Sequence, residues 1–176
     1  EAGAPFTRTE DVLSAVRQNP DARAVLLTRP DYFGRMMELG QIAKAAHAAG
    51  MLVLVDEAHG AHLNWLDGLK CVYRPDDGAG RECVSALNMG ADMCVQSAHK
   101  TLPALTGGAF LHMNERVDAD RLLSRVALTQ SSSPSFLIMA SLDSAREYMD
   151  EHGCTELSRV ADECERVLDE CRTLDI

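Results

Sequence analysis

The sequence VLVDEAHGAHLNW (53–65) places an acid and two histidines directly after an apolar run. A carboxylate at the end of a buried strand is costly unless a cation or hydrogen-bond donors answer it. Ser97 and Lys100 lie at and just beyond the end of another apolar run, ADMCVQS (91–97). In open α/β sheets, ligands bind beyond the carboxyl ends of the parallel strands. Asp56 and Lys100 are therefore expected to face the same crevice.

A lysine opposite a carboxylate fits the chemistry of pyridoxal phosphate. Its amine can form a Schiff base with the aldehyde, and the acid can keep a pyridinium nitrogen protonated. The loop after the lysine holds Pro103, Gly107 and Gly108, and serine and backbone N–H groups in such a loop suit a phosphate. A plain structural ion pair between Asp56 and Lys100 fits the same residues, so both interpretations stay open at this point.

Strands and helices alternate along the first hundred residues, which predicts a doubly wound sheet. Every position of 51–55 is apolar, as in a strand covered on both faces of a parallel sheet. The expected elements are a helix over 9–20 with Thr9 as N-cap, a strand over 24–28, a turn at 29–31, a helix over 36–50 closed by Gly50, a strand over 51–55, a loop over 64–80, a short helix over 82–90 and a strand over 91–97.

A further strand, expected over 107–113, breaks this alternation. Only about nine residues precede it after the previous strand, whereas a parallel crossover needs a dozen or more, so it should run antiparallel. Helices are expected over 118–130, from Pro134 to Gly153 and over 156–174. The predicted fold class is α/β: a mixed, mostly parallel sheet flanked by helices, with one antiparallel strand and a helical C-terminal part.

Composition restricts the function classes. The net charge is −10 at pH 7 and no Lys/Arg-rich run is present, which makes nucleic acid and anionic membrane surfaces poor partners. No apolar run approaches the roughly 20 residues that span a bilayer. The six cysteines lack CxxC spacing, so we expect a reduced, cytoplasmic protein with a buried thiol at Cys94 and a packing role for Cys164 and Cys171.

Three motif blocks, VDEAHGAH, QSAHKTLPALT and SSSPSFLIMASLDSAR, follow one another along the chain. Together they resemble the bacterial ornithine/lysine/arginine decarboxylases, which are built on the aspartate-aminotransferase fold (fold type I). The resemblance extends from the AVLLT strand to the SLDSAR helix. It implies a pyridoxal-phosphate-dependent lyase of polyamine metabolism, which decarboxylates arginine, lysine or ornithine to the corresponding amine.

The resemblance also implies roles around the cofactor ring. Lys100 would form the Schiff base and move protons at the substrate Cα, and Asp56 would pair with the pyridinium nitrogen. Ala58 would pack against the ring face. His59 would reach the phenolic oxygen of the ring, although a satisfied loop histidine fits the same position.

A second group of residues is implied near the cofactor phosphate. Ser97 would bind the phosphate, or it merely ends its strand, and His99 would act beside the lysine as a catalytic residue. Ser131 and Ser132 resemble the segment that reaches the phosphate in a neighbouring subunit, which implies a homodimer or higher homo-oligomer with shared sites. The serines fit equally well as a cap for the helix opened by Pro134. No metal ligand is implied, and no site role is assigned to the remaining loop, helix and strand histidines His62, His47 and His112.

The chain departs from the family pattern in three ways. Asp31 stands where the family shows threonine in Pro-Thr-Tyr-x-Gly, which is expected to alter hydrogen bonding near the cofactor. Gly107 stands where the family tends to have glutamine, which is expected to loosen the loop after the lysine. Family chains are longer, so residues 1–176 are expected to form a single, partial cofactor-binding domain without the N-terminal part of that domain and without the C-terminal domain.

Three other function classes remain open on the sequence. An aminotransferase of the same fold would share Lys100 and Asp56. An inactive subunit fragment would explain the missing segments. A metal-dependent hydrolase would use Asp56, Glu57, His59 and His62, although it leaves SAHK without a role.

Overall fold

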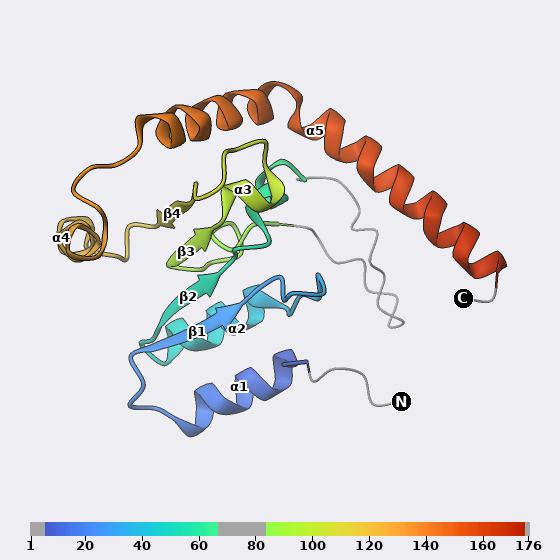
Figure 1. The fold of residues 1–176 in the computed structure, drawn as a ribbon. Coiled ribbons are helices and arrows are strands. Elements are labelled where there is room, and N and C mark those ends of the chain that lie inside the picture. Colours follow the sequence, from blue (N-terminus) through green and yellow to red (C-terminus); the bar gives the residue numbers. More distant parts are fainter. Residues whose placement is uncertain (1–5, 67–83, 175–176) are drawn as a thin grey trace.

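The computed structural model describes residues 6–66 and 84–174, which form a four-stranded sheet with helices around it (Figure 1). The strand order is β1-β2-β3-β4. Strands β1 (Ala24–Thr28), β2 (Leu52–Asp56) and β3 (Met93–Gln96) are parallel, and β4 (Phe110–Met113) runs antiparallel beside β3. The predicted mixed sheet with one reversed strand is confirmed.

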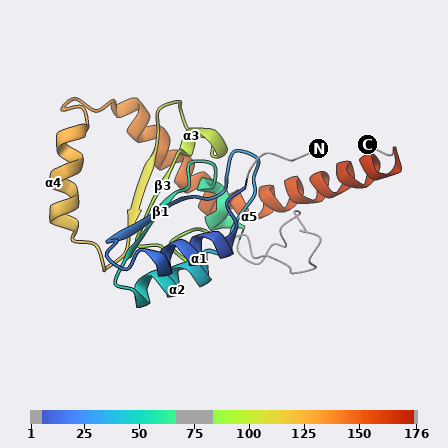
Figure 2. The ribbon, with the colours of Figure 1, turned by 90° about the horizontal axis from the view of Figure 1, so that it is seen from below.

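Two helices, α1 (Thr9–Gln18) and α2 (Leu39–Ala48), lie side by side against one face of the sheet (Figures 1 and 2). Their apolar faces enclose the larger core, which includes Val12, Ile42, Val53, Val55 and Cys94. The predicted buried thiol at Cys94 is confirmed, and burial raises its pKa to about 12.

Gly50 closes α2 as predicted. Its φ of +77° is a left-handed conformation that favours glycine, and the amides of Gly50 and Met51 donate to the carbonyls of His47 and Ala46. At the other end of the α1–α2 pair, the N-cap prediction is wrong. Arg8 is the N-cap of α1, and the Thr9 hydroxyl instead accepts a hydrogen bond from Glu38 N at 3.0 Å.

The opposite face of the sheet is open among the described residues. Leu26 is 72% exposed, Val95 41% and Leu111 45%. Leu54 and Asp56 lie on this face, because successive side chains of β2 alternate between the faces and Val53 and Val55 enter the core. The prediction that β2 is covered on both faces is therefore wrong for this part of the chain.

The two C-terminal helices predicted by the sequence are one. Helix α5 runs without a break from Phe136 to Thr173, and its carboxyl half extends beyond the sheet (Figures 1 and 2). Gly153, read as a helix end, is buried: a Cβ there would lie 2.9 Å from Met149 Cε and 3.0 Å from Trp65 Cγ. Glycine is thus explained by the close approach of the short helix η1 (Ala61–Trp65), not by chain termination.

The remaining predictions are partly confirmed. Helix α4 (Ala119–Thr129) forms as expected, with Asp118 as its N-cap. The described part of the helix expected over 82–90 is a single turn that ends at Gly90, with φ +98°. Most of the loop predicted over 64–80, together with Cys71 and Cys83, lies outside the described residues.

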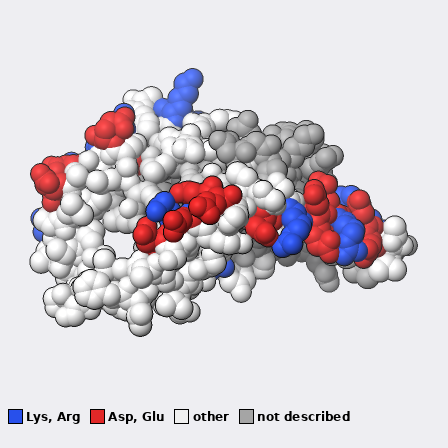
Figure 3. Space-filling model, turned by 90° about the horizontal axis from the view of Figure 1, so that it is seen from above, with Lys and Arg blue, Asp and Glu red and all other residues white. Residues whose placement is uncertain are grey.

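The exposed side of α5 is highly charged. Ion pairs one turn apart join Arg146 to Asp143 and Asp150, Arg159 to Glu156, Arg166 to Glu163 and Glu170, and Arg172 to Asp169. Figure 3 shows acidic and basic side chains alternating along this surface. Cys164 is exposed on α5, so its predicted packing role finds no partner among the described residues. No described helix is both long enough and apolar enough to cross a membrane.

Candidate active site

Lys100 lies on α3 (Ala98–Thr101), a single helical turn that directly follows β3 and was not predicted. The side chain is exposed, and Lys100 Nζ lies 3.4 Å from His59 Nε2. His59 follows the end of β2, so the ends of two adjacent parallel strands bring these residues together. The two motifs thus meet at one edge of the sheet through this pair, while the expectation that Asp56 and Lys100 face the same crevice stays a prediction.

Asp56 is the last residue of β2 and is half-buried. Its Oδ1 accepts a hydrogen bond from Ala58 N at 3.0 Å. The other carboxylate oxygen has no hydrogen-bond partner within residues 6–66 and 84–174, and Asp56 forms no ion pair with Lys100 there. The interpretation of Asp56 and Lys100 as a structural ion pair is therefore not supported. The second oxygen of Asp56 can accept a hydrogen bond from a ligand.

The loop that carries Lys100 is held against α5 and β4. His99 Nδ1 lies 3.0 Å from the carbonyl oxygen of Gly108, and Leu105 N donates to Ser141 Oγ at 2.7 Å. A Cβ on Gly108 would lie 2.8 Å from Leu142 Cδ2. Gly107 has φ +96°, a left-handed conformation that favours glycine. Gly107 thus shapes a loop that is anchored by its neighbours, and the expectation that glycine loosens this loop relative to glutamine stays a prediction.

Ser97 and Ala58 lie at the two strand ends. Ser97 is the N-cap residue of α3, but its hydroxyl makes no capping hydrogen bond; its carbonyl oxygen accepts from Lys100 N at 3.1 Å. Both residues are half-buried. The serine hydroxyl is thus free of helix capping, and the small side chain of Ala58 adds little bulk beside Asp56.

The segment after β1 contributes an aromatic side chain. The Tyr32 ring meets the His59 ring edge-on at a centroid distance of 5.8 Å, and Tyr32 is largely exposed. Asp31, one of the departures from the family pattern, accepts hydrogen bonds from Phe33 N and Arg35 N and pairs with Arg35 Nε at 2.7 Å. Burial alone would raise the pKa of Asp31, but these Arg35 and Phe33 interactions outweigh it and lower the pKa. Its carboxylate is therefore engaged within its own loop.

Beneath Asp56 lies a buried polar network that sequence reasoning missed. Glu57 and Arg29 are 0% and 1% exposed, and Arg29 Nη1 lies 3.6 Å from Glu57 Oε1. Gln96 Nε2 donates to Glu57 Oε2 at 2.7 Å. One signal was available: each of these residues directly follows, or ends, an apolar strand. Aligning the three strand ends would have grouped them.

The protein-family model described as "Orn/Lys/Arg decarboxylase, major domain" matches residues 5–175 of the sequence. The chain belongs to the Orn/Lys/Arg decarboxylase family. Among its relatives, the protein YaaO of Bacillus subtilis (strain 168) is 47% identical over 140 residues, which cover 78% of this chain and 26% of that protein. An arginine decarboxylase from the same organism is 34% identical over 164 residues, or 93% of this chain and 30% of that protein. The chain thus spans about a quarter to a third of the length of these relatives.

The fold is shared more widely than the family. A serine palmitoyltransferase from Sphingomonas wittichii superimposes with a TM-score of 0.62 at 19% identity, over 93% of this chain and 39% of that chain. This likeness shows a common fold, that of the fold type I pyridoxal phosphate enzymes.

Pyridoxal phosphate is the cofactor of the decarboxylase family, and the donor set of this site fits it. An aldehyde needs a primary amine, which Lys100 supplies, and a ring N–H needs an acceptor, which the free oxygen of Asp56 supplies. The Ser97 hydroxyl and the small Ala58 lie at the same strand ends. The residues of this chain that would hold the cofactor are therefore compatible with its chemistry.

Ser131 and Ser132 are not part of this group. They lie in the exposed segment between α4 and α5, where Ser131 Oγ accepts a hydrogen bond from Ser133 N at 3.1 Å (Figure 1). The N-cap of α5 is Ser135, and Pro134 precedes the helix, so the alternative that the triplet caps it is wrong. Contact with a neighbouring subunit stays a prediction for these serines.

The metal-hydrolase alternative loses one of its ligands. Both Glu57 oxygens accept hydrogen bonds inside the core, and the described ranges contain no group of three or more His, Cys, Asp or Glu side chains arranged for a metal. His62 is partly buried, which lowers its pKa, and its Nδ1 has no hydrogen-bond partner among the residues that the structure describes. As expected, His47 and His112 bond structurally, to Asp92 and Gln96 respectively.

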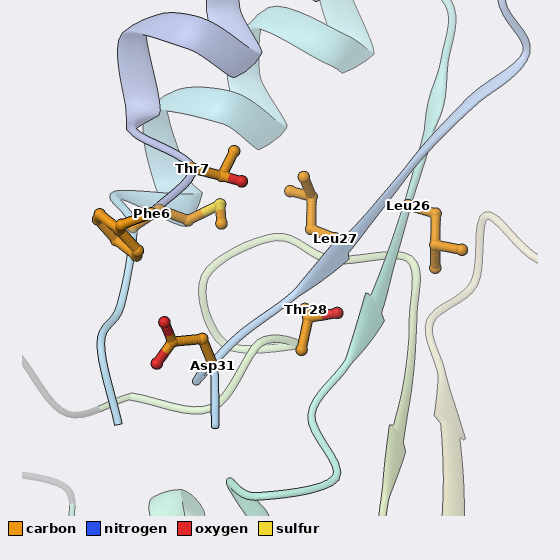
Figure 4. Close-up of a pocket in the computed structure, with 7 residues that line it drawn as sticks. Phe6, Thr7, Leu26, Leu27, Thr28 and Asp31 are labelled. Atoms are coloured by element: carbon orange, nitrogen blue, oxygen red, sulfur yellow. The ribbon is translucent and has the colours of Figure 1, made fainter. Parts of the chain in front are cut away.

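A cavity of about 330 Å³ lies elsewhere, beside β1 (Figure 4). It is lined by Phe6, Thr7, Leu26, Leu27, Thr28, Asp31 and Met37. Among the described lining residues only Asp31 is ionisable, and it is engaged with Arg35. Lys100 is not among these lining residues, so this cavity is not the candidate active site.

Proposed function

We propose that this protein is a pyridoxal-phosphate-dependent decarboxylase of a basic amino acid, and that this chain is part of its cofactor-binding domain. The observation that carries the proposal is the meeting of Lys100 Nζ with His59 Nε2, at 3.4 Å, three residues after Asp56, one of whose carboxylate oxygens has no hydrogen-bond donor among the described residues. Membership of the decarboxylase family and the arginine decarboxylases among the relatives support it. Arginine is therefore the first substrate to test, followed by lysine and ornithine.

Each residue of the site has a role in this proposal. When bound, pyridoxal phosphate supplies the electron sink for the bond that breaks at the substrate Cα. Lys100 holds the cofactor and later moves a proton at Cα, and His59 Nε2 orients the lysine amine. Asp56 holds the proton on the ring nitrogen. Ser97 binds the phosphate, and His99, bonded to Gly108, fixes the loop beside the reacting atoms.

We also propose a cytoplasmic homodimer or higher homo-oligomer with shared sites. The position of Ser131 and Ser132 supports this arrangement, because they are exposed and belong to a segment at the edge of the described chain (Figure 1). In the oligomer, their hydroxyls reach the cofactor phosphate of the neighbouring subunit.

The decisive experiment locates the cofactor on the chain. Borohydride reduction of the protein expressed from its complete gene, followed by peptide mapping, should place pyridoxal phosphate on Lys100. This chain contains two other lysines, Lys44 and Lys70. Lys100→Ala should lose the visible absorbance of the cofactor and all CO₂ release from arginine, lysine and ornithine, because no other amine replaces Lys100 at this site.

The matched control is Lys44→Ala, since Lys44 is exposed on α2. It should keep the parental absorbance and CO₂ release. Cofactor attached to a lysine other than Lys100, or CO₂ release by Lys100→Ala, would contradict the proposal. Amino-group transfer to a keto acid without CO₂ release would point to an aminotransferase.

A further inference from the structure

Glu57 follows Asp56 in the chain but enters the opposite side of the sheet. Its carboxylate is fully buried and accepts two hydrogen bonds, from Ala86 N to Oε1 at 2.8 Å and from Gln96 Nε2 to Oε2 at 2.7 Å. Burial raises the pKa of Glu57, while these two hydrogen bonds and the nearby Arg29 oppose the rise. Two adjacent acids of one motif therefore occupy opposite environments.

Arg29 supplies the countercharge. Its guanidinium donates to Val84 O at 2.9 Å and to Met37 O at 3.3 Å, in addition to its 3.6 Å approach to Glu57. Burial lowers the pKa of Arg29, and the charge of Glu57 opposes this shift. The pair is costly to bury, yet each partner is almost completely satisfied by hydrogen bonds.

The network reaches all four strands. Arg29 follows β1, Glu57 follows β2, and Gln96 ends β3. On β4, His112 Nε2 lies 3.0 Å from Gln96 Oε1. The strand ends at the candidate site are thus linked by side-chain hydrogen bonds as well as by the backbone hydrogen bonds of the sheet.

The same network encloses the peptide of Asp56. Arg29 N donates to Asp56 O at 2.9 Å, and Glu57 N donates to Val95 O at 2.9 Å. Gly60 closes over the Glu57 side chain, since a Cβ on Gly60 would lie 2.5 Å from Glu57 Cγ. The backbone on both sides of Asp56 is therefore fixed from below.

We propose that Glu57, with Arg29 and Gln96, is a positioning residue for Asp56: the buried network sets the depth and direction of the Asp56 carboxylate at the cofactor ring. This inference rests on the proposed function, because it takes Asp56 as the acceptor for the ring nitrogen. A displacement of about 1 Å at a reacting group costs roughly a hundredfold in rate, so a network that fixes one strand end affects catalysis without contacting the cofactor.

The test is a double-mutant cycle in the protein expressed from its complete gene. Glu57→Gln removes the negative charge and replaces one of the two carboxylate oxygens with an NH₂ group. That NH₂ group faces another donor, either Ala86 N or Gln96 Nε2, so the hydrogen bonds of the network must rearrange. Asp56→Asn removes the acceptor for the ring proton. If Glu57 acts through Asp56, then Glu57→Gln should lower kcat by about tenfold to a hundredfold in the parent and by less than about twofold in Asp56→Asn. The KM for the amino acid should change little.

Two further variants separate positioning from stability. Asp92→Asn alters another fully buried carboxylate, at the start of β3, and should lower the unfolding midpoint while leaving kcat and the cofactor Kd at parental values. The exchange Glu57→Gln with Gln96→Glu restores the hydrogen bonds with Ala86 N, between residues 57 and 96, and with His112, although it moves the negative charge from residue 57 to residue 96. It should therefore recover part of the kcat lost in Glu57→Gln.

Cofactor binding and unfolding of the cofactor-free protein are measured alongside activity. We expect Glu57→Gln to raise the cofactor Kd several-fold, whereas equal losses of kcat in the parental and Asp56→Asn backgrounds would overturn the proposal. Parental kcat and Kd in Glu57→Gln would overturn it as well. Should Glu57→Gln not fold, Gln96→Met takes its place in the cycle with the same expected and contrary outcomes. Absence of cofactor on Lys100 in the parent is a failure of the proposed function instead.

Discussion

Asp56 and Glu57 show how one short motif serves two sides of a sheet. Within residues 6–66 and 84–174, one Asp56 oxygen has no hydrogen-bond partner at the open side of the sheet, while both Glu57 oxygens accept hydrogen bonds in the core. His59 meets Lys100, and Gly60 leaves room for the Glu57 side chain. The division follows from the alternation of side chains along an extended strand.

Asp92 provides a residue-scale prediction about pH. Burial alone would raise its pKa, but hydrogen bonds from Val53 N at 2.7 Å, from His47 and from Asn114 outweigh burial, so its pKa lies below the ordinary value. Because the unfolded carboxyl titrates near pH ~3.9, the stability that Asp92 contributes is complete above that pH and is lost as pH falls through the lower, folded pKa.

Asp92→Asn should therefore lower the free energy of unfolding by about 3 kcal/mol at neutral pH, and the gap to the parent should narrow below about pH 4. Denaturant unfolding at a series of pH values measures both effects. Asp120→Asn, at an exposed position of α4, is the control and should stay within about 0.5 kcal/mol of the parent. If the free energies of unfolding of Asp92→Asn and the parent differed by the same amount at every pH, the lowered pKa of Asp92 would be refuted.

The sequence was sufficient to bring the two motifs of the candidate site to one edge of the sheet, but it did not reveal the buried network beneath them. Asp56 and Lys100 follow apolar runs at neighbouring strand ends, and the contact between Lys100 and His59 joins the two motifs. The pairing of Arg29 with Glu57 and Gln96 depends on strand register, and the hydrogen bond from Arg29 to Val84 joins residues 55 positions apart. Periodicity carries no information about such separations.

At the scale of elements, glycine is where sequence reading and structure differ most. Gly153 was interpreted as the end of a helix, yet it lies inside α5 because Trp65 and Met149 approach it closely. The strand direction of β4, in contrast, followed correctly from the length of its connection. Chain length restricts topology, whereas close packing becomes visible only when two elements are docked.

Gly108 gives the prediction at this scale. Gly108→Ala should place a Cβ about 2.8 Å from Leu142 Cδ2, separate the Lys100 loop from α5, and cost about 1–3 kcal/mol of stability. Cofactor affinity should fall with it. Thermal unfolding and cofactor titration measure the two effects.

Two variants make this prediction specific. Gly40→Ala is the matched control, because the nearest atom to a new Cβ on Gly40 is 3.9 Å away and its position in α2 favours alanine. Combining Gly108→Ala with Leu142→Ala makes room for the new methyl group and should recover part of the cofactor affinity. A loss in Gly108→Ala no greater than that in Gly40→Ala would contradict the packing argument.

At the scale of the whole molecule, the site is expected to depend on a second subunit. If Ser131 and Ser132 serve the neighbouring site, a Ser131→Ala/Ser132→Ala subunit and a Lys100→Ala subunit should complement each other. In a mixed dimer, one site combines the intact lysine of the first subunit with the intact serines of the second, while the other site has neither.

Activity should thus rise when the two inactive proteins are unfolded, mixed and refolded, toward about a quarter of the parental value for random pairing. Refolding each variant alone is the control. No gain on mixing, with mixed dimers shown by differential tagging, would place the serines in the site of their own subunit or outside it altogether.

Helix α5 contacts the rest of the described chain near Gly153 and Ser141, and its carboxyl half extends beyond these contacts. Its 38 residues measure about 57 Å along a helix that bends between its two halves (Figure 1), with Trp65 packed near Gly153 and Ser141 bonded to the loop that carries Lys100. Thr173 lies about 30 Å along the helix beyond Gly153, and Ser141 lies about 18 Å before it. A tilt of about 5° about Gly153 would move Thr173 by roughly 2.6 Å and Ser141 by roughly 1.6 Å in the opposite direction. A displacement of the charged far end of the helix would thus reach the loop that carries Lys100 in the opposite direction and smaller by about two fifths.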